Sequence, residues 1–222
     1  MKAIIPSAGR GERMRPLTDT LPKPLLVVGD KPLILWHIEK LKKSGFNEIV
    51  INIAHLGQKI IDYLGDGSEF GVSILYSDER NCGGLESAGG IKKALDLLGD
   101  EPFLVVNGDV FCSYIFDSSF DLKGKKAHLI LVKNPEHNLD GDFGLNNACV
   151  LNEDTNLYTF SGIGYYAPAL FNSLKSAKYG LAPLLRQEIK NNYVSGEIYH
   201  GDWHDIGTPQ RLQNINNRLK LD

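Results

Sequence analysis

Short continuous apolar runs alternate with longer segments of mixed polarity along the first half of the chain. The runs lack polar alternation, which is typical of strands whose two faces are both covered. We expect strands at residues 2–6, 48–53, 72–76, 103–107 and 128–132. Between them, segments 32–44, 57–64 and 87–98 place apolar residues at helical spacing and predict helices. This alternation predicts an α/β fold with a mostly parallel central sheet.

The second half of the chain is less regular but contains the same kinds of element. Strands are expected at 143–150 and 157–166, and helices at 168–174, 182–191 and 208–219. No internal repeat, low-complexity tract or linker divides the sequence. Its 222 residues suit one large core better than two independent cores, so we expect a single domain over residues 1–222.

The overall charge argues against nucleic acid as a partner. The chain has 24 basic and 27 acidic residues and a formal net charge of -3, so any phosphate binding has to be local. The hydrophobic fraction of 42% and the charged fraction of 23% are ordinary for a globular protein. Three scattered cysteines without a Cys-x-x-Cys pair argue against a disulfide framework or a zinc cluster.

No segment predicts a membrane partner. The apolar start of the chain is soon interrupted by Arg10, Arg13 and Arg15, so it is too short for a signal-peptide core or a membrane-spanning helix. No later segment is long and apolar enough to span a membrane. We therefore expect a cytoplasmic protein.

Three segments that carry polar or glycine residues follow predicted strands. They are residues 7–25, Asp109 and residues 83–90. In open α/β sheets, ligands bind outside the carboxyl ends of the strands. We therefore expect these segments to meet around one binding cleft.

The segment 7–25 (SAGRGERMRPLTDTLPKPL) combines flexible backbone with positive charge. Its glycines allow backbone amides to approach an anion, while Arg13 and Lys23 supply charge. It is not a dinucleotide fingerprint, because Met14 stands at the third glycine position, and it is not a Walker A loop. A solvated basic surface turn is the alternative, although three prolines stiffen the segment. We interpret the segment as a phosphate-binding loop.

Residues 8–18 (AGRGERMRPLT) and 22–25 (PKPL) resemble the signature of the sugar-1-phosphate nucleotidyltransferases. The resemblance extends to residues 107–109 (NGD) and 203–208 (WHDIGT), so it covers nearly the whole chain. It implies the family's three-layer, Rossmann-like nucleotidyltransferase fold. The likeness is closest to the short bacterial N-acetylmuramate α-1-phosphate uridylyltransferases. The segments that carry this closer likeness are 65–68, 85–91, 141–143, 160–163 and 181–187.

The resemblance implies an Mg²⁺-dependent transfer from a nucleoside triphosphate to a sugar 1-phosphate, which releases pyrophosphate. The best match is UTP with N-acetylmuramic acid 1-phosphate, in peptidoglycan recycling. Two alternatives stay open: a mannose- or heptose-type guanylyl- or cytidylyltransferase, and a catalytically silent nucleotide-sugar-binding regulator. The regulator is less favoured because all four charged residues that the chemistry needs are present. A monomer or simple dimer is expected.

The family motifs also imply roles for individual residues. Arg13 and Lys23 would be catalytic, and Asp109 and Asp205 would bind Mg²⁺. The nucleotide would be bound by Ala8, Gly9, Gly11, Arg13, Gly89 and Gly90. The sugar phosphate would be bound by Asn107, Asp142, Gly144, Ser161, Gly162 and Arg186.

Several of these residues have an ordinary structural alternative. Asp109 and Asp205 could each belong to a turn or cap a helix. Gly83 and Gly84 could simply give a flexible loop before a helix. Arg186 could pair with the lactyl carboxylate of N-acetylmuramate, but an arginine on a helix surface is the commoner case. The chain also has Ser87 and Ala88 where the related uridylyltransferases usually have Thr-Gly, which leaves the base preference open.

Overall fold

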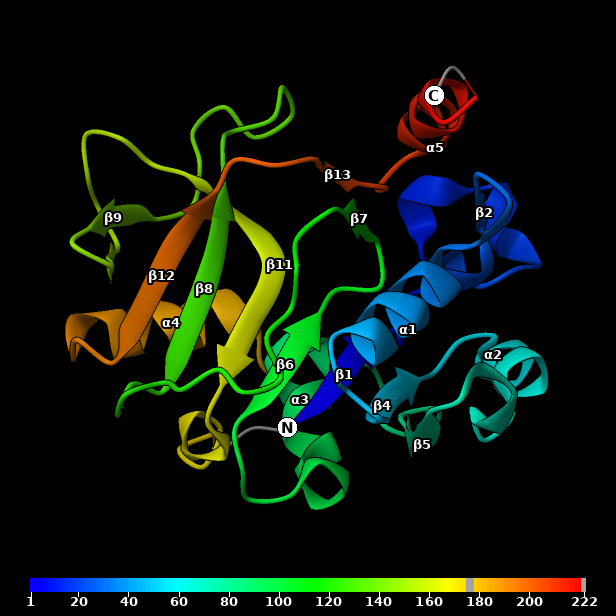
Figure 1. The fold of residues 1–222 in the computed structure, drawn as a ribbon, viewed down its shortest axis with the longest axis horizontal. Helices are drawn as coiled ribbons and strands as arrows, with labels where there is room; N and C mark the ends of the chain where they lie inside the picture. Colours follow the sequence, from blue (N-terminus) through cyan, green and yellow to red (C-terminus); the bar gives the residue numbers. More distant parts are fainter. Residues whose placement is uncertain (175–177, 221–222) are drawn as a thin grey trace.

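The computed structural model describes residues 1–174 and 178–220, and its main feature is a nine-stranded sheet of order β5-β4-β1-β6-β11-β8-β12-β10-β9 (Figure 1). The first four strands in this order are all parallel to one another. They are β5 (Ser73–Asp78), β4 (Glu48–Ile53), β1 (Lys2–Pro6) and β6 (Phe103–Val106). Their carboxyl ends therefore lie at one edge of the sheet, as the alternating pattern predicts.

The remaining strands form a mixed half of the sheet. β11 (Thr159–Tyr166) is antiparallel to both β6 and β8 (Ala127–Val132), whereas β12 (Val194–Tyr199) is parallel to β8. Next to β12, this half of the sheet ends in a small antiparallel extension, which is formed by β10 (Cys149–Leu151) and β9 (Gly144–Asn146). The predicted parallel sheet is thus confirmed for the central strands β4, β1 and β6, and the whole sheet is mixed.

Helices cover both faces of the sheet and create two separate hydrophobic clusters. α1 (Leu33–Lys43) and α2 (Gly57–Leu64) pack on one face, while α3 (Glu86–Leu98) and α4 (Leu181–Lys190) pack on the other. The central strand β1 contributes Ala3 and Ile5 to the first cluster and Ile4 to the second. This explains why β1 is apolar at successive positions, and it confirms the predicted three-layer α/β fold.

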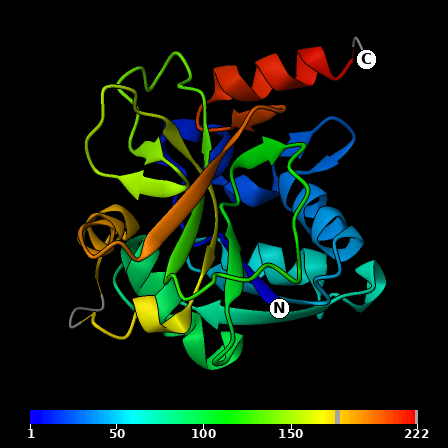
Figure 2. The same ribbon diagram turned by 60° about the vertical axis from the view of Figure 1, so that its left-hand side comes forward.

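Smaller elements surround the carboxyl edge of the parallel strands. β7 (Val110–Cys112) pairs with β13 (Trp203–Asp205), and β2 (Val27–Val28) pairs with β3 (Lys31–Pro32). α5 (Pro209–Arg218) lies across this end of the molecule, as Figure 2 shows. Its residue Ile215 packs against Met14 and Ile206 in a third apolar cluster. This cluster anchors the loop after β1 to the C-terminal helix.

The remaining helical segments are short 3-10 turns. They are η1 (Glu12–Met14), η2 (Leu17–Asp19), η3 (Lys23–Leu25), η4 (Ser68–Phe70) and η5 (Pro168–Leu170). In the part of the chain that the structure describes, no helix is long and apolar enough to cross a membrane.

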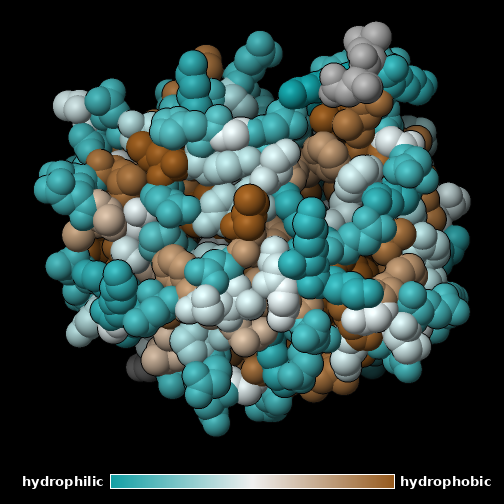
Figure 3. All heavy atoms as spheres, in the orientation of Figure 1, coloured by the Kyte–Doolittle hydropathy of each residue, from teal (hydrophilic) through white to brown (hydrophobic). Residues whose placement is uncertain are grey.

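The face of the molecule seen in Figure 3 is largely hydrophilic, with apolar side chains in separate groups.

Two predicted elements are wrong, and five short or polar strands escape prediction. The predicted strand 143–150 is the hairpin of β9 and β10, because Asn147 and Ala148 form a turn with φ of 47° and 62°. The predicted helix 168–174 is only the 3-10 turn η5. The strands without a sequence signal are β2, β3, β7, β12 and β13. In β12 the interior residues Ser195, Gly196 and Glu197 interrupt the apolar pattern.

Candidate active site

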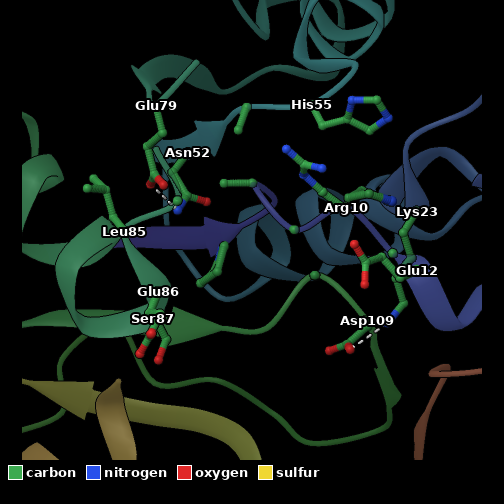
Figure 4. Close-up of a pocket in the computed structure, with 18 of the residues that line it drawn as sticks. Arg10, Glu12, Lys23, Asn52, His55, Glu79, Leu85, Glu86, Ser87 and Asp109 are labelled. Carbon is green, nitrogen blue, oxygen red and sulfur yellow. Dashed lines mark hydrogen bonds and ion pairs between the residues drawn. The ribbon is translucent and has the colours of Figure 1, made fainter. Parts of the chain in front are cut away.

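A cavity of about 1060 Å³ opens at the carboxyl ends of the parallel strands. Its wall contains the loop after β1, the ends of β4 and β6, and the segment between β5 and α3 (Figure 4). All three segments singled out in the sequence therefore meet here. The residues with predicted roles that line the cavity are Ala8, Gly9, Gly11, Arg13, Lys23, Asn107 and Asp109.

The loop after β1 is held in a defined shape. Gly11 has φ 64°, which favours glycine, and its carbonyl accepts a hydrogen bond from Oγ1 of Thr18 at 2.8 Å. Met14 is fully buried and anchors the far side of the loop. Arg10 and Arg13 are exposed and line the cavity, as does His55, and Figure 4 labels Arg10 and His55 among the lining residues. The loop can therefore present both amides and guanidinium groups to an anion.

The ammonium of Lys23 forms an ion pair with the carboxylate of Asp109, with Nζ 2.6 Å from Oδ2 (Figure 4). Lys23 begins η3, where Pro24 and Leu25 are buried and hold the turn in place. Asp109 directly precedes β7. The pair thus joins the phosphate-binding loop to the end of the central sheet.

The pairing of β7 with β13 brings the two predicted metal ligands to neighbouring strands. Asp205 is the register partner of Val110, and the backbone N–H of Ile206 donates to the carbonyl of Asp109 at 2.7 Å. Asp205 is not among the residues that line the cavity, but Gly207, two positions further along the chain, is one of them. The backbones of Asp109 and Asp205 are therefore adjacent at this corner of the site.

The donor set at this corner suits a magnesium ion. Lys23 holds Oδ2 of Asp109, and Oδ1 of Asp205 is held by other side chains. Within residues 1–174 and 178–220, the other oxygen of each carboxylate has no hydrogen-bond partner. Mg²⁺ commonly takes one or two carboxylates together with substrate phosphates and waters. Asp109 and Asp205 offer such a pair.

A buried polar network forms the wall of the cavity beyond the phosphate-binding loop. Asn52 accepts from the backbone N–H of Ser7 at 2.5 Å and donates to Oε1 of Glu79 at 2.6 Å. Both Asn52 and Glu79 are 5% exposed, and burial raises the pKa of the Glu79 carboxyl above its ordinary value. Gly90 packs behind them, because a Cβ there would lie 2.6 Å from Oε1 of Glu79.

At the start of α3, the backbone near Gly89 and Gly90, two of the predicted nucleotide-binding residues, is already hydrogen-bonded within the protein. The N–H groups of Ala88 and Gly89 both donate to the carbonyl of Tyr179, at 3.0 and 3.1 Å. Ser87 Oγ accepts from the N–H of Leu181 at 2.8 Å. The amide of Gly89 is therefore occupied, and neither Gly89 nor Gly90 lines the cavity.

The turn before α3 and the first two residues of the helix form the cavity edge. Its lining residues are Gly83, Gly84, Leu85, Glu86 and Ser87. The two glycines have φ of 70° and 79°, a backbone region that suits glycine and few other residues. Glu86 has φ 60° although it has a side chain. Strained backbone of this kind at a cavity edge is characteristic of functional sites.

Among the residues predicted to bind the sugar, Asn107 and Gly162 lie next to each other. The N–H of Asn107 donates to the carbonyl of Gly162 at 2.9 Å. Gly162 has φ 79° and sits where the pairing of β11 with β8 shifts register, in an irregularity of the strand. Of the predicted sugar-binding residues, only Asn107 lines the cavity.

The other predicted sugar-binding residues have structural contacts. Ser161 is 1% exposed and donates to the carbonyl of Ile130 at 2.6 Å. Asp142 accepts from the N–H of Phe160 at 2.8 Å, and Gly144 packs so closely on Asp154 that a side chain would not fit. These contacts fix the backbone between β8 and β11.

Arg186 supports the same loop from α4. Its Nη2 lies 3.1 Å from the carbonyl of Asp142, and its guanidinium stacks over the ring of Phe143 at 4.9 Å. The side chain is exposed and is not part of the cavity wall. The structure therefore places Arg186 on the helix surface, in contact with the loop between β8 and β9.

Several cavity residues have no role in the sequence motifs. They are Arg10, Asn52, His55, Glu79, Glu86 and Ser87. A signal was available for two of them, because Asn52 is a polar residue within the apolar run EIVINI and Glu79 directly follows β5. Polar residues at the carboxyl ends of parallel strands point to a ligand site. The position of His55 depends on the loop after β4 and had no such signal.

Comparison with known proteins agrees with this geometry. Residues 2–149 match the family model described as "Nucleotidyl transferase". The N-acetylmuramate alpha-1-phosphate uridylyltransferase of Neisseria meningitidis serogroup B is 53% identical in an alignment that covers 96% of this chain and 96% of that protein. The UTP–glucose-1-phosphate uridylyltransferase of Synechocystis is 31% identical over 90% of this chain, which spans 52% of that longer protein.

A solved structure extends the comparison to the three-dimensional fold. It is the crystal structure of a Bacillus anthracis protein described as a glucose-1-phosphate thymidylyltransferase. The two folds agree with a TM-score of 0.86 at 25% sequence identity, over 99% of this chain and 95% of the other. Together with the match over residues 2–149, this shows that the chain belongs to the nucleotidyl transferase family.

Proposed function

We propose that this protein transfers the uridylyl group of UTP to N-acetylmuramic acid 1-phosphate, forming a UDP-sugar and pyrophosphate in peptidoglycan recycling. The ion pair of Lys23 with Asp109 inside the cavity carries the proposal for the reaction, because it places a cation and a metal-binding carboxylate together. The choice of UTP and of the sugar rests on the similar Neisseria protein, which is 53% identical.

The reaction requires stabilisation of negative charge more than proton transfer. An oxygen of the sugar 1-phosphate attacks the α-phosphorus of UTP, a new P–O bond forms, and the bond to the β-phosphate oxygen breaks. The attacking oxygen is already negative at neutral pH, so no general base has to create it. Arg13 and the amides of the loop after β1 bind the triphosphate and the leaving pyrophosphate. Lys23 lies where the two phosphates meet.

Asp109 and Asp205 hold the magnesium ion in this proposal. Bound Mg²⁺ neutralises charge on the phosphate oxygens. The two carboxylates lie on neighbouring strands and each has one oxygen without a protein partner in the described residues. Lys23 supplies its own positive charge at the opposite oxygen of Asp109.

The two substrates occupy opposite sides of this corner. We assign the base to the wall formed by Asn52, Glu79 and the segment 83–87, which is the part of the cavity beyond the phosphate loop. The sugar lies beside Asn107, Gly162 and the loop that contains Asp142. Arg186 holds that loop through its contact with the carbonyl of Asp142, outside the cavity wall, and pairing with the lactyl carboxylate of the sugar is the additional role that the Arg186 variant below tests.

The remaining properties follow the same proposal. The chain acts as one nucleotidyltransferase domain over residues 1–222, which is supported by the nine-stranded sheet to which both halves of the sequence contribute. It works in the cytoplasm, as a monomer or simple dimer, without nucleic acid or membrane as a partner.

Pyrophosphate release tests the proposal directly. The purified protein is incubated with each of UTP, GTP, CTP and dTTP, combined with the 1-phosphates of N-acetylmuramic acid, N-acetylglucosamine, glucose, mannose and a heptose. We expect the highest kcat/KM for UTP with N-acetylmuramic acid 1-phosphate, and loss of turnover after chelation of divalent cations. A preference for GTP with mannose 1-phosphate would replace this substrate assignment. Nucleotide binding without turnover of any pair would indicate a regulator.

The lactyl assignment has its own test. Arg186→Ala should raise the KM for N-acetylmuramic acid 1-phosphate more than the KM for N-acetylglucosamine 1-phosphate, since only the former has the carboxylate. The same increase for both sugars would assign Arg186 to support of the loop alone.

A further inference from the structure

Two side chains outside the sequence motifs hold Asp205 at one oxygen. Nη1 of Arg211 and Nε2 of His137 each lie 2.9 Å from Oδ1 of Asp205. Arg211 belongs to α5, and His137 belongs to the loop between β8 and β9. Residues that are far apart in the sequence therefore meet at a single carboxylate oxygen.

The backbone beside Asp205 is adapted to the guanidinium of Arg211. Gly207 leaves room for it, because a Cβ at that position would overlap Nη2 of Arg211. The following residue, Thr208, is the N-cap of α5, and its side chain accepts from the backbone N–H of Arg211 at 3.3 Å. The Arg211 side chain is only 21% exposed. The segment from Asp205 to Arg211 thus forms one packed unit.

His137 approaches the same oxygen from the sugar side. Its loop also contains Asp142, whose carboxylate is held by the backbone of Phe160. The contact of His137 with Asp205 therefore connects the sugar-side loop to the proposed metal ligand. Oδ2 of Asp205 has no partner among the residues that the structure describes.

We propose that Arg211 and His137 are positioning residues that hold Oδ1 of Asp205 and leave Oδ2 directed to the divalent cation. This inference rests on the proposed role of Asp205 as a metal ligand. Hydrogen-bond partners of a ligating carboxylate fix its orientation, and loss of such a partner typically lowers metal affinity or activity 10- to 100-fold. The charge of Arg211 by itself opposes a nearby cation, so its benefit lies in the fixed rotamer of Asp205.

The chain offers a matched control on the same helix. Arg218 of α5 forms an ion pair with Asp202 at 2.9 Å, and neither residue lines the cavity. Arg218→Ala removes the same kind of interaction from α5, and the contacts of Arg218, which are to Asp202 and to Nε2 of His204, do not include the carboxylate of Asp205. Two conservative variants distinguish loss of the contact with Asp205 from loss of side-chain volume. Arg211→Lys keeps the positive charge, and His137→Gln keeps an N–H donor.

The experiment uses Mn²⁺ as the probe and UTP without a sugar phosphate. Calorimetry gives the affinity for UTP with and without Mn²⁺, and the ratio of the two is the metal-dependent gain. We expect Arg211→Ala and His137→Ala to reduce this gain about tenfold or more. Arg211→Lys and His137→Gln should restore part of it, and Arg218→Ala should keep the full gain. Thermal unfolding, followed by circular dichroism, checks that each variant is folded.

The outcomes distinguish this inference from the proposed function. If Asp205→Asn loses the gain while Arg211→Ala and His137→Ala keep it, the positioning role is overturned and the metal site stands. If Asp205→Asn keeps the gain, the metal role of Asp205 fails, and the inference fails with it. Should Arg211→Ala not fold, Arg211→Lys and the two His137 variants decide, because full retention of the gain in all three contradicts the proposal.

Discussion

Nζ of Lys23 lies 2.6 Å from Oδ2 of Asp109, although 86 positions separate the two residues in the chain. Their side chains are 14% and 31% exposed, so the pair borders the cavity and is not sealed in the core. Each partner has a different task once substrates arrive: the ammonium faces phosphate oxygens, and the carboxylate faces the cation. Without substrates, the positive charge of Lys23 and the negative charge of Asp109 neutralise each other.

Lys23→Met should lower kcat by about 10²- to 10³-fold, the usual effect of removing one group that stabilises charge in the transition state. The melting temperature should change little, because partly exposed ion pairs contribute little to stability. Steady-state kinetics with UTP and the sugar phosphate provide the measurement. A near-normal kcat would show that Lys23 serves only to hold Asp109.

Gly162→Ala should damage the sugar side of the site. A Cβ at Gly162 would lie 2.7 Å from Nδ2 of Asn107, so the Asn107 side chain would have to move. Gly124→Ala is a matched control, because Gly124 has the same φ of 79° but no atom within 4 Å of its Cβ position. Both variants should lose about 1–2 kcal/mol of stability from the positive φ.

Only Gly162→Ala should raise the KM for the sugar phosphate. We expect an increase of about tenfold, while the KM for UTP stays close to that of the unmodified protein, since a displacement near 1 Å at a site can cost up to 10²-fold. Kinetics that are equal for Gly162→Ala and Gly124→Ala would exclude Asn107 from sugar binding.

Glu79→Gln should stabilise the protein at neutral pH. Burial raises the pKa of Glu79 above its ordinary value of 4.5, so the unfolded chain ionises this group first as the pH rises. Ionisation in the unfolded state favours unfolding, and Glu79 therefore lowers stability progressively above pH 4.5. Glutamine removes this charge and can still accept the hydrogen bond from Asn52. Melting temperatures at pH 4 and pH 7 should show a larger advantage of Glu79→Gln at pH 7.

His37 should make the protein sensitive to acid. Burial lowers the pKa of His37 from 6.5 to about 4, with a smaller contribution from the charge of Lys40 and an opposing one from Asp109. The unfolded chain therefore takes up a proton that the folded chain refuses, and stability falls as the pH decreases from 6.5 to about 4. The loss reaches about 3 kcal/mol at most.

His37→Leu should reduce this acid sensitivity, since Nε2 of His37 is buried without a hydrogen-bond partner in the described structure. The measurement is the free energy of unfolding in urea at pH 7 and pH 4.5. His200→Leu is the control, because His200 is exposed. If both variants show the same dependence on pH, another group causes the effect.

Local sequence patterns were sufficient to predict the bounds of several central elements of the fold. β1, β4 and α2 have the predicted bounds, because each is a continuous apolar run or a segment with clear helical spacing. β7 and β13 were not predicted, and they are three residues each. Strands of this length have too few positions for a pattern, and their pairing forms only when distant segments meet.

The layered α/β architecture and the cationic loop after β1 could be predicted from the amino-acid sequence, since both follow from residue order over short distances. Only the tertiary structure decided which atoms contact one another within the site. It placed Lys23 on Asp109, put Glu79 and Asn52 into one buried network, and occupied the amide of Gly89 with the carbonyl of Tyr179. Such contacts join residues tens of positions apart, and their partners are set by the packing of the sheet and helices, which no local pattern encodes.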